Sequence, residues 1–260
     1  MKVTILGARG SIATSGRDVQ EFGGATSCVL VETDKEAVFI DAGTGIMNSP
    51  DLGDRRISIL ISHPHMDHLG GLPFFPYLYE PGCKIDIYAA NRNGLSTTMQ
   101  LDRMISPPLW PLRVADYKSD VVCHDIRHPF SIGDIHIDLL ESHHPGGCTL
   151  FRVTHEDRSL VYATDYEHEI ESLDELVSFS EGTDLLLYDA QYTDEEYEEK
   201  KGFGHSTAGM GLRVMKESGA KQLRFVHHDP RHTDEMMRKM ESAVGSDTVA
   251  YAREGEVIEL

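Results

Sequence analysis

The segment that most constrains this chain is HPHMDHLGG at 63–71, which directly follows the apolar run ISILIS. It places three histidines and an aspartate within six positions, whereas a solvated face is usually richer in lysine and glutamate. In an extended segment, His63 and His65 project to the same side and can share one metal ion. Asp67 and His68 point elsewhere and suit a second ion, because one zinc ion rarely takes more than about four protein ligands.

Further candidate ligands stand at the ends of other apolar runs. His144 lies in ESHHPGG, Asp165 ends SLVYATD, and His227 follows QLRFV. Each of them precedes a turn, which is where a sheet protein gathers functional side chains at one rim. Asp41, in FIDAGTG, also ends a run and can hydrogen-bond a ligand imidazole from behind.

Short apolar runs rich in β-branched residues dominate the first two-thirds of the chain and predict strands. These runs are 3–6, 27–33, 37–41, 57–62, 84–90, 134–140, 149–155 and 159–165, with 222–228 and 248–252 later. Helices are predicted at 93–105, 172–180, 206–218 and 233–244. This pattern predicts two packed sheets with helices outside, and the length of 260 residues allows one large domain or two small ones.

The four cysteines are far apart and form no C-x-x-C, so they are predicted to be small core residues in a reducing compartment. No stretch approaches the roughly 20 apolar residues of a membrane span. The opening MKVTILGARGS has an apolar part too short for the core of a signal peptide. Together these features predict a soluble cytoplasmic protein with no membrane partner.

The formal net charge of −19 bears on the partners of the chain. A large nucleic acid binds mainly through lysines and arginines that neutralise its phosphates. This chain has no basic run, and its densest charge run, DEEYEEK at 194–200, is acidic. A large nucleic-acid partner is therefore disfavoured, whereas a small anionic substrate remains compatible, because bound metal inverts the local charge.

Two segments fit no regular element. GARGS at 7–11 lacks the full G-x-G-x-x-G and a well-placed following helix, so it is predicted to be a turn near the site rim. SPPLWPLRVADY at 106–117 holds three prolines and the single tryptophan. It is either a surface excursion packed on its own apolar residues or a lid or dimer contact. Because Trp110 lies among prolines, we expect it to be exposed and predict a homodimer in which 106–117 packs near the partner's site.

The motif HPHMDH at 63–68 matches the H-x-H-x-D-H signature of the metallo-β-lactamase superfamily. FIDAGTG, ESHHPGG, YATD and FVHH follow the order of the other superfamily motifs, so the resemblance covers nearly the whole chain. It implies a four-layer αββα sandwich in the α/β class, with two mixed sheets face to face and helices outside. It also implies a single domain over 1–260, with the metals at one edge of the sheets.

The resemblance also implies two divalent ions, for which zinc suits the histidine-rich ligands and manganese is compatible with the carboxylates. By this resemblance the first ion is held by His63, His65 and His144, and the second by Asp67, His68 and His227. Asp165 would bridge them. His144 is preferred to His143 because it lies seven residues before Phe151, as in ribonuclease Z-like members. His227 is preferred to His228 because it directly follows the strand; roles for His143 and His228 behind the ligands or in solvent stay open.

GHST at 204–207 resembles a segment of the ribonuclease Z-like, phosphodiesterase branch, where this histidine contacts or protonates the phosphate. The alternative is an ordinary helix start with Ser206 as N-cap. Members that process tRNA carry an inserted arm. Here only twenty residues separate His144 from Asp165, and they are predicted to be two strands around a turn. The absence of the arm disfavours a tRNA 3′-processing endonuclease.

These features predict a dinuclear metal-dependent hydrolase, above all a phosphodiesterase acting on small cyclic nucleotides or related phosphate esters. Two ions can activate a water for attack on phosphorus. Asp67 would orient or deprotonate that nucleophile, and His205 would protonate the leaving oxygen. The alternatives are a hydrolase of lactones, thioesters or other acyl substrates, which GHST disfavours, and a non-catalytic metal-dependent binding protein, which the full ligand set disfavours.

Overall fold

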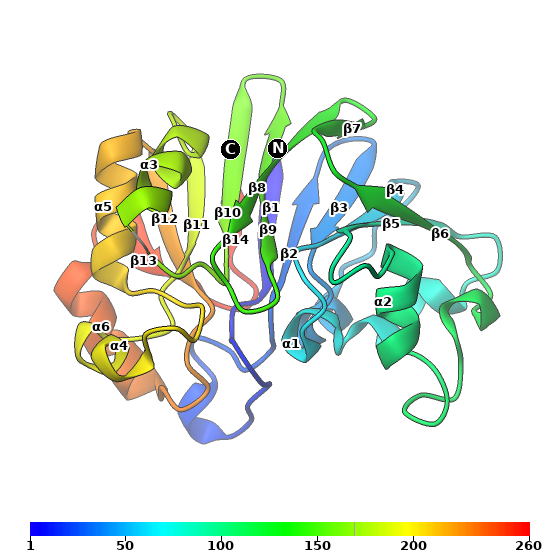
Figure 1. The fold of residues 1–260 in the computed structure, drawn as a ribbon, viewed down its shortest axis with the longest axis horizontal. Helices are drawn as coiled ribbons and strands as arrows, with labels where there is room; N and C mark the ends of the chain where they lie inside the picture. Colours follow the sequence, from blue (N-terminus) through cyan, green and yellow to red (C-terminus); the bar gives the residue numbers. More distant parts are fainter. Residues whose placement is uncertain (169) are drawn as a thin grey trace.

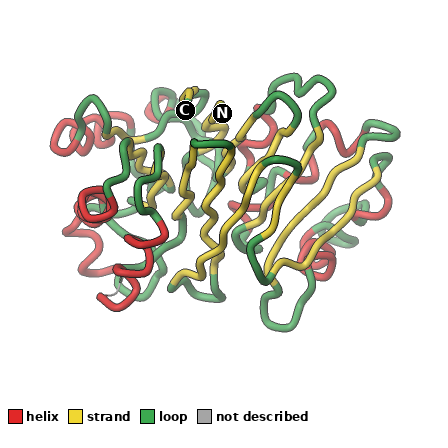
Figure 2. The backbone as a smooth tube through the Cα atoms, turned by 90° about the horizontal axis from the view of Figure 1, so that it is seen from above, coloured by secondary structure: helices red, strands yellow, loops and turns green. Residues whose placement is uncertain are grey.

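Two seven-stranded mixed sheets pack face to face, with helices on both outer faces (Figure 1). The computed structural model describes residues 1–168 and 170–260. Seen from above, the strands form the two central layers and the helices flank them (Figure 2). The four-layer αββα arrangement predicted from the sequence is confirmed.

The first sheet has an antiparallel half and a parallel half. In spatial order its strands are β14 (Val257–Glu259), β1 (Lys2–Gly7), β2 (Cys28–Glu32), β3 (Glu36–Ile40), β4 (Arg56–Ile61), β5 (Lys84–Ala90) and β6 (Asp120–Ile126). The pairs from β14 to β3 are antiparallel, and those from β3 to β6 are parallel.

The second sheet repeats this division. In spatial order its strands are β13 (Val249–Tyr251), β12 (Gln222–Val226), β11 (Leu185–Asp189), β10 (Arg158–Ala163), β9 (Cys148–His155), β8 (Ile135–Ser142) and β7 (Phe130–Ile132). The pairs from β13 to β10 are parallel, and those from β10 to β7 are antiparallel. Each sheet therefore has a group of parallel strands whose carboxyl ends can position functional side chains.

Six α-helices complete the described part of the chain. They are α1 (Met66–Leu69), α2 (Thr97–Met104), α3 (Ile170–Phe179), α4 (Asp194–Lys200), α5 (Ala208–Ser218) and α6 (Asp234–Val244). Helix α2 lies over the first sheet, whereas α3, α5 and α6 lie over the second (Figure 1). No helix among the described residues is long and apolar enough to span a bilayer.

The alternation of side chains along the strands separates three apolar layers. In β2, Val29 and Val31 point between the sheets, where they join a cluster that includes Phe151 of β9. Their neighbours Cys28 and Leu30 join a different cluster, on the outer face of the first sheet. A third cluster lies between the second sheet and its helices. The two sheets therefore share one core and hold a rigid edge for the site.

The predicted strands are confirmed to within about two residues at most ends, but several elements were missed. The missed strands and α-helices are β6, β7, β11, β14, α1 and α4. Strand β6 lies at the edge of its sheet and carries polar side chains, so its apolar pattern is weak. Strand β11 is buried on both faces and therefore shows a continuous apolar run that does not separate strand from helix.

One smaller expectation, on the cysteines, and one alternative, on Ser206, are wrong. Cys28 and Cys148 are buried as predicted, but Cys83 and Cys123 are half-buried, because they lie at the periphery of the outer core of the first sheet. Ser206 is not the N-cap of α5, since Thr207 occupies that position. The hydroxyl of Ser206 instead lies 2.9 Å from the hydroxyl of the buried Tyr188.

The segment 106–117 is irregular apart from one short 3-10 turn. Trp110 is half-buried, not exposed: its ring contacts Phe74 with centroids 5.0 Å apart, and its Nε1–H donates to Tyr117 at 2.9 Å. The exposed apolar side chain of the segment is its neighbour Leu109. The segment therefore packs its apolar side chains against the outer core of the first sheet as well as against one another, and the homodimer stays a prediction.

Candidate metal centre

The site lies where the parallel strands of both sheets end. Asp41 follows β3 and His63 comes just after β4, while Asp165 comes just after β10. Asp189 ends β11, and His227 directly follows β12. Because the two sheets face each other, side chains from both converge at this edge, as expected for ligands at the carboxyl ends of strands.

The backbone turns sharply at three of these positions. Asp41, Asp165 and His227 have φ values of 63°, 50° and 63°, in the left-handed region that non-glycine residues rarely adopt. Such a conformation costs about 1–3 kcal/mol at each position and persists only where the surroundings enforce it. Strain of this kind concentrates at functional sites. Here the side chains of all three residues are buried at the candidate metal centre.

The first group of candidate ligands comprises His63, His65, His144 and Asp165, whose ligand atoms lie within 4.8 Å of one another. The rings of His63 and His65 have centroids 4.3 Å apart, as expected for neighbours on one side of an extended segment. The Nδ1–H of His144 donates to the Gly204 carbonyl at 3.1 Å, which leaves Nε2 for the group. His143 is exposed and lies outside this group.

The second group comprises Asp67, His68 and His227, and all three are buried. Oδ2 of Asp67 lies 3.1 Å from Nε2 of His227 and 3.3 Å from Nε2 of His68. Oδ2 of Asp165 is 3.2 Å from Nε2 of His68, whereas its Oδ1 is 3.6 Å from Nε2 of His144. The two oxygens of Asp165 therefore face different groups, which is the geometry of a bridging carboxylate.

Asp41 orients His68 from behind. Its Oδ2 lies 2.7 Å from Nδ1 of His68, so the imidazole N–H donates to the carboxylate and Nε2 faces the group. Ser62 donates to Asp41 through both its backbone N–H and its hydroxyl, and the Tyr162 hydroxyl adds a bond of 3.1 Å. A carboxylate behind a ligand histidine fixes the ring and raises its basicity.

The histidines of the first group share one electrostatic trend. Burial lowers the pKa of His63, His65 and His144, because it penalises the charged imidazolium. Neighbouring imidazoles add to the effect at His63. These rings are therefore neutral near pH 7, which is the form that binds metal.

The histidines of the second group show the opposite trend. Burial opposes the charged form of His68, but nearby carboxylates, Asp67 foremost, outweigh it and raise its pKa well above the usual value. The pKa of His227 rises to about 9, because Asp165 and Asp67 outweigh burial there too. In return, these imidazoles hold the pKa of both carboxyls below the usual range despite burial.

The residues fit a metal site. Nε2 of His63 is buried and makes no hydrogen bond within the described residues, and Oδ1 of Asp165 lies 3.7 Å from it. A buried polar atom without a partner is costly unless an ion or water satisfies it. Imidazole and carboxylate ligands together suit zinc, and also manganese. The two clusters are thus able to bind metal.

His205 lies beside the clusters and is positioned by a residue that the sequence analysis missed. Its Nδ1 is 2.9 Å from Oδ2 of Asp189, and its ring stacks on that of His227 with centroids 4.8 Å apart. Asp189 also accepts from the backbone N–H groups of Asp165 and Ser206. The sequence did contain a signal for Asp189, because LLLYD is an apolar run that ends in an aspartate, just as SLVYATD does.

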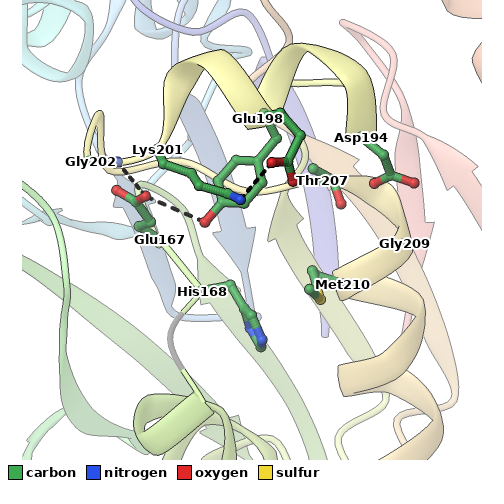
Figure 3. Close-up of a pocket in the computed structure, with 10 residues that line it drawn as sticks. Glu167, His168, Asp194, Glu198, Lys201, Gly202, Thr207, Gly209 and Met210 are labelled. Atoms are coloured by element: carbon green, nitrogen blue, oxygen red, sulfur yellow. Dashed lines mark hydrogen bonds and ion pairs between the residues drawn. The ribbon is translucent and has the colours of Figure 1, made fainter.

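A second missed residue, Glu167, holds the loop before His205 (Figure 3). Its two carboxylate oxygens accept from the backbone N–H groups of Gly202 and Gly204, at 2.5 and 2.8 Å. The carbonyl of Gly204 in turn accepts from His144. Glu167 therefore connects the loop after β10 to a ligand of the first group and to His205. It lies in YEHE, which carries no motif that would single it out.

GARGS lies at the rim of the site, as predicted, but it turns only at its end, at Ser11, because Arg9 forms β-bridges with Thr26 and His228. The backbone N–H of Ser11 donates to Oδ2 of Asp67 at 2.7 Å. A Cβ on Gly10 would lie 2.3 Å from Nδ1 of His227, so only glycine allows this close approach. The buried guanidinium of Arg9 donates to the carbonyls of Gly23, Asp229 and His232. The segment thus supports Asp67 and His227 from outside the ligand groups.

His228 points away from the ligand groups. Its Nε2 donates to the carbonyl of Ala252 at 2.9 Å, and its ring lies edge-on to Phe22. Burial lowers its pKa to about 3, so the ring is neutral. The geometry thus assigns His228 to the packing behind the site and leaves His227 at it.

A domain model described as the β-lactamase superfamily domain matches residues 36–228. The chain belongs to the metallo-β-lactamase superfamily. The chain is similar to ribonuclease Z of Halobacterium salinarum, with 25% identity over 302 residues that cover 96% of this chain and 94% of the relative. The resemblance drawn from its motifs is therefore confirmed.

Solved structures of this superfamily share the fold. The metallo-β-lactamase fold protein YhfI from Bacillus subtilis superposes with a TM-score of 0.74 at 21% identity, covering 99% of both chains. A diphosphatase from the PhnP family superposes with a TM-score of 0.68 at 19% identity, covering 100% of this chain and 97% of the other.

Proposed function

We propose that this metallo-β-lactamase superfamily member is a dinuclear metal-dependent phosphodiesterase for small anionic substrates, such as cyclic nucleotides and related phosphate esters. The observation that carries the proposal is the pairing of His205 with Asp189 beside the two ligand groups. Two of its similar proteins, a ribonuclease Z and a diphosphatase, are named for the cleavage of phosphate esters or anhydrides, which supports this chemistry.

His205 would donate the proton that the leaving oxygen needs. Because its Nδ1–H is held by Asp189, the other ring nitrogen is the one that faces the substrate. A carboxylate at Nδ1 fixes the tautomer and stabilises the imidazolium, as in other histidine–carboxylate pairs. A general acid positioned in this way contributes about 10²–10⁴-fold to the rate.

The seven proposed ligands would hold two divalent ions, zinc or manganese, which would polarise a water and offset the charge of the phosphoryl oxygens. Asp67 has a further role in this proposal. Its Oδ2 is occupied by the N–H of Ser11 and by His227. In this proposal Asp67 would also orient or deprotonate the nucleophilic water.

The preference for small substrates rests on what this chain lacks and on its charge. Strands β9 and β10 pair around the short turn at 156–157, so no arm is inserted between His144 and Asp165. The alignment with the Halobacterium ribonuclease Z spans 302 residues, more than this chain has, so the relative carries residues absent here. The net charge of −19 also opposes a long polyanion.

The test is product analysis with protein loaded with zinc or manganese. The panel comprises cyclic mono- and dinucleotides, bis-p-nitrophenyl phosphate, a lactone, nitrocefin and a precursor tRNA. Hydrolysis of the phosphodiesters and not of the acyl substrates is expected. Turnover of the lactone or nitrocefin alone would establish the acyl alternative, and efficient cleavage of the tRNA would establish a ribonuclease. Metal uptake without any turnover would establish a binding protein.

A further inference from the structure

A cavity of about 440 Å³ adjoins the first ligand group, and we call it the side pocket. His63 and His65 form one wall, and the others come from the loop after β5, from helix α2, from Leu109 and from the glycines at 146–147. A substrate that reacts at the ligand groups has one substituent within reach of this space. The segment 106–117 thus contributes to the site through Leu109, although its tryptophan packs elsewhere.

The side pocket has an apolar lining at its mouth. Met66 and Leu109 are 76% and 74% exposed, which is unusual for large apolar side chains that face the same cavity. Leu95 and Met104, both half-buried, continue the apolar surface inward. Apolar surface gathered in one concavity is typical of a ligand site, because a bound apolar group removes it from water.

The polar part of the lining includes Asn93, Gln100 and two arginines, and the arginines differ in their surroundings. Arg92 is occupied, since it forms an ion pair with Glu141 and donates to the Thr149 hydroxyl at 2.5 Å. Arg103, exposed on α2, has no ion pair within the described part of the chain. A planar guanidinium can stack on an aromatic ring or bind an acceptor on its edge. Beside Met104 and Leu109, it suits a flat ring rather than a flexible chain.

We propose that the side pocket binds a flat aromatic ring, such as a nucleotide base or an aryl group, on the substituent that stays bonded to phosphorus. This inference rests on the proposed function and specifies its substrate. We assign the pocket to the retained substituent because His205, which would protonate the leaving oxygen, does not line the pocket. The leaving oxygen would lie beside His205, whose ring stacks on that of His227, and neither of these histidines lines the side pocket.

The test compares substrates that share a leaving group and differ in the retained substituent. The p-nitrophenyl esters of phenylphosphonate and methylphosphonate both release p-nitrophenolate. For metal-loaded wild type we expect kcat/KM to favour the phenyl ester by about tenfold, the scale of discrimination that an apolar pocket provides. Calorimetric titration with free phenylphosphonate and methylphosphonate measures the same preference without any chemistry.

The variants remove the apolar wall and the guanidinium separately. Leu109→Asp should abolish the phenyl preference, and Arg103→Gln should reduce it about threefold, the scale of one modest contact. Both residues are exposed, so folding should not change, and a thermal melt checks this. Met99→Ala, on the exposed face of the same helix, and Arg127→Gln, which makes the same charge change outside the pocket, should leave the preference intact.

Two results separate this inference from the proposed function. If wild type discriminates between the free phosphonates but hydrolyses neither ester, the phosphodiesterase proposal fails and the pocket inference stands. If both esters are hydrolysed and the phenyl preference is absent, or survives Leu109→Asp and Arg103→Gln, the pocket inference is wrong and the proposed function stands.

Discussion

The two groups of candidate ligands share Asp165 but differ in their exposure. In the first group His65 is exposed and His144 half-buried, and both His63 and His65 line the side pocket. The second group of Asp67, His68 and His227 is buried. The difference indicates that an ion in the first group would face the substrate, whereas an ion in the second would be anchored within the protein.

The two groups of candidate ligands also differ in their charge. The first offers neutral imidazoles with lowered pKa values, and Asp165 is its one carboxylate. The second places Asp67 and Asp165 against two imidazoles whose pKa values are raised. Since a carboxylate adds Coulomb attraction for a cation, we expect the second group to hold its ion more tightly once the ion has displaced the protons of His68 and His227. The following variants test this division, from the largest expected effect to the smallest.

Asp165→Ala removes the ligand that the two groups share, so it should abolish metal binding in both groups and with it the difference between them. With neither group complete, metal content should fall from about two ions per chain to near zero, and phosphodiester hydrolysis should be lost. Elemental analysis after gel filtration measures this, with circular dichroism to confirm the fold. Retention of one full ion would show that Asp165 belongs to a single group and does not bridge.

His205→Ala should separate chemistry from metal binding. His205 is not one of the seven proposed ligands, so metal content should not change, while kcat and kcat/KM for a cyclic nucleotide should fall about 10²–10⁴-fold. The loss should be smaller for bis-p-nitrophenyl phosphate, because p-nitrophenolate leaves without a proton. Loss of metal in this variant would instead make His205 a ligand, as its place within 4.8 Å of Asp165 and His227 allows.

Asp41→Asn should weaken the second group alone. The amide keeps one acceptor oxygen but can turn an NH₂ toward Nδ1 of His68, where the carboxylate now accepts at 2.7 Å. Loss of such a partner typically costs about 10–100-fold in metal affinity. Competition with a chelating dye should show one weakened ion and one unchanged. Tyr162→Phe, which removes only a hydroxyl donor to Asp41, is the matched control; equal weakening of both ions in Asp41→Asn would contradict the division.

The sequence predicted the ligand groups well because their residues stand in contiguous motifs at strand ends. H-x-H-x-D-H places four of them in one loop, and each remaining one ends an apolar run. The residues that hold these side chains were harder to predict, since their partners are distant in sequence. Asp189 meets Asp165 across two parallel strands, and Glu167 meets Gly204 across 37 positions. The pattern of apolar residues also does not show that Leu109 lines a pocket whereas Trp110 packs against Phe74.

Glu167→Gln should give the smallest effect, because it loosens a connection without removing a ligand. The amide can accept from only one of the two glycine N–H groups that the carboxylate now satisfies. Loss of one hydrogen bond of about 1 kcal/mol corresponds to roughly a fivefold fall in kcat. If Glu167 acts by positioning His205, this fall should show the leaving-group dependence of His205→Ala, with melting temperature and the second ion unchanged.

Glu198→Gln is the matched control for that variant. Glu198 lines the same cavity as Glu167 (Figure 3), but it pairs with the Lys201 side chain at 2.8 Å and contacts neither glycine. It should leave kcat and its leaving-group dependence unchanged. A fall in kcat that is equal for good and poor leaving groups would place the effect of Glu167 on the first ligand group instead, since Gly204 also accepts from His144. That result would show that the first group, which is the more exposed of the two, also depends on the loop at 202–204, whereas the buried second group does not.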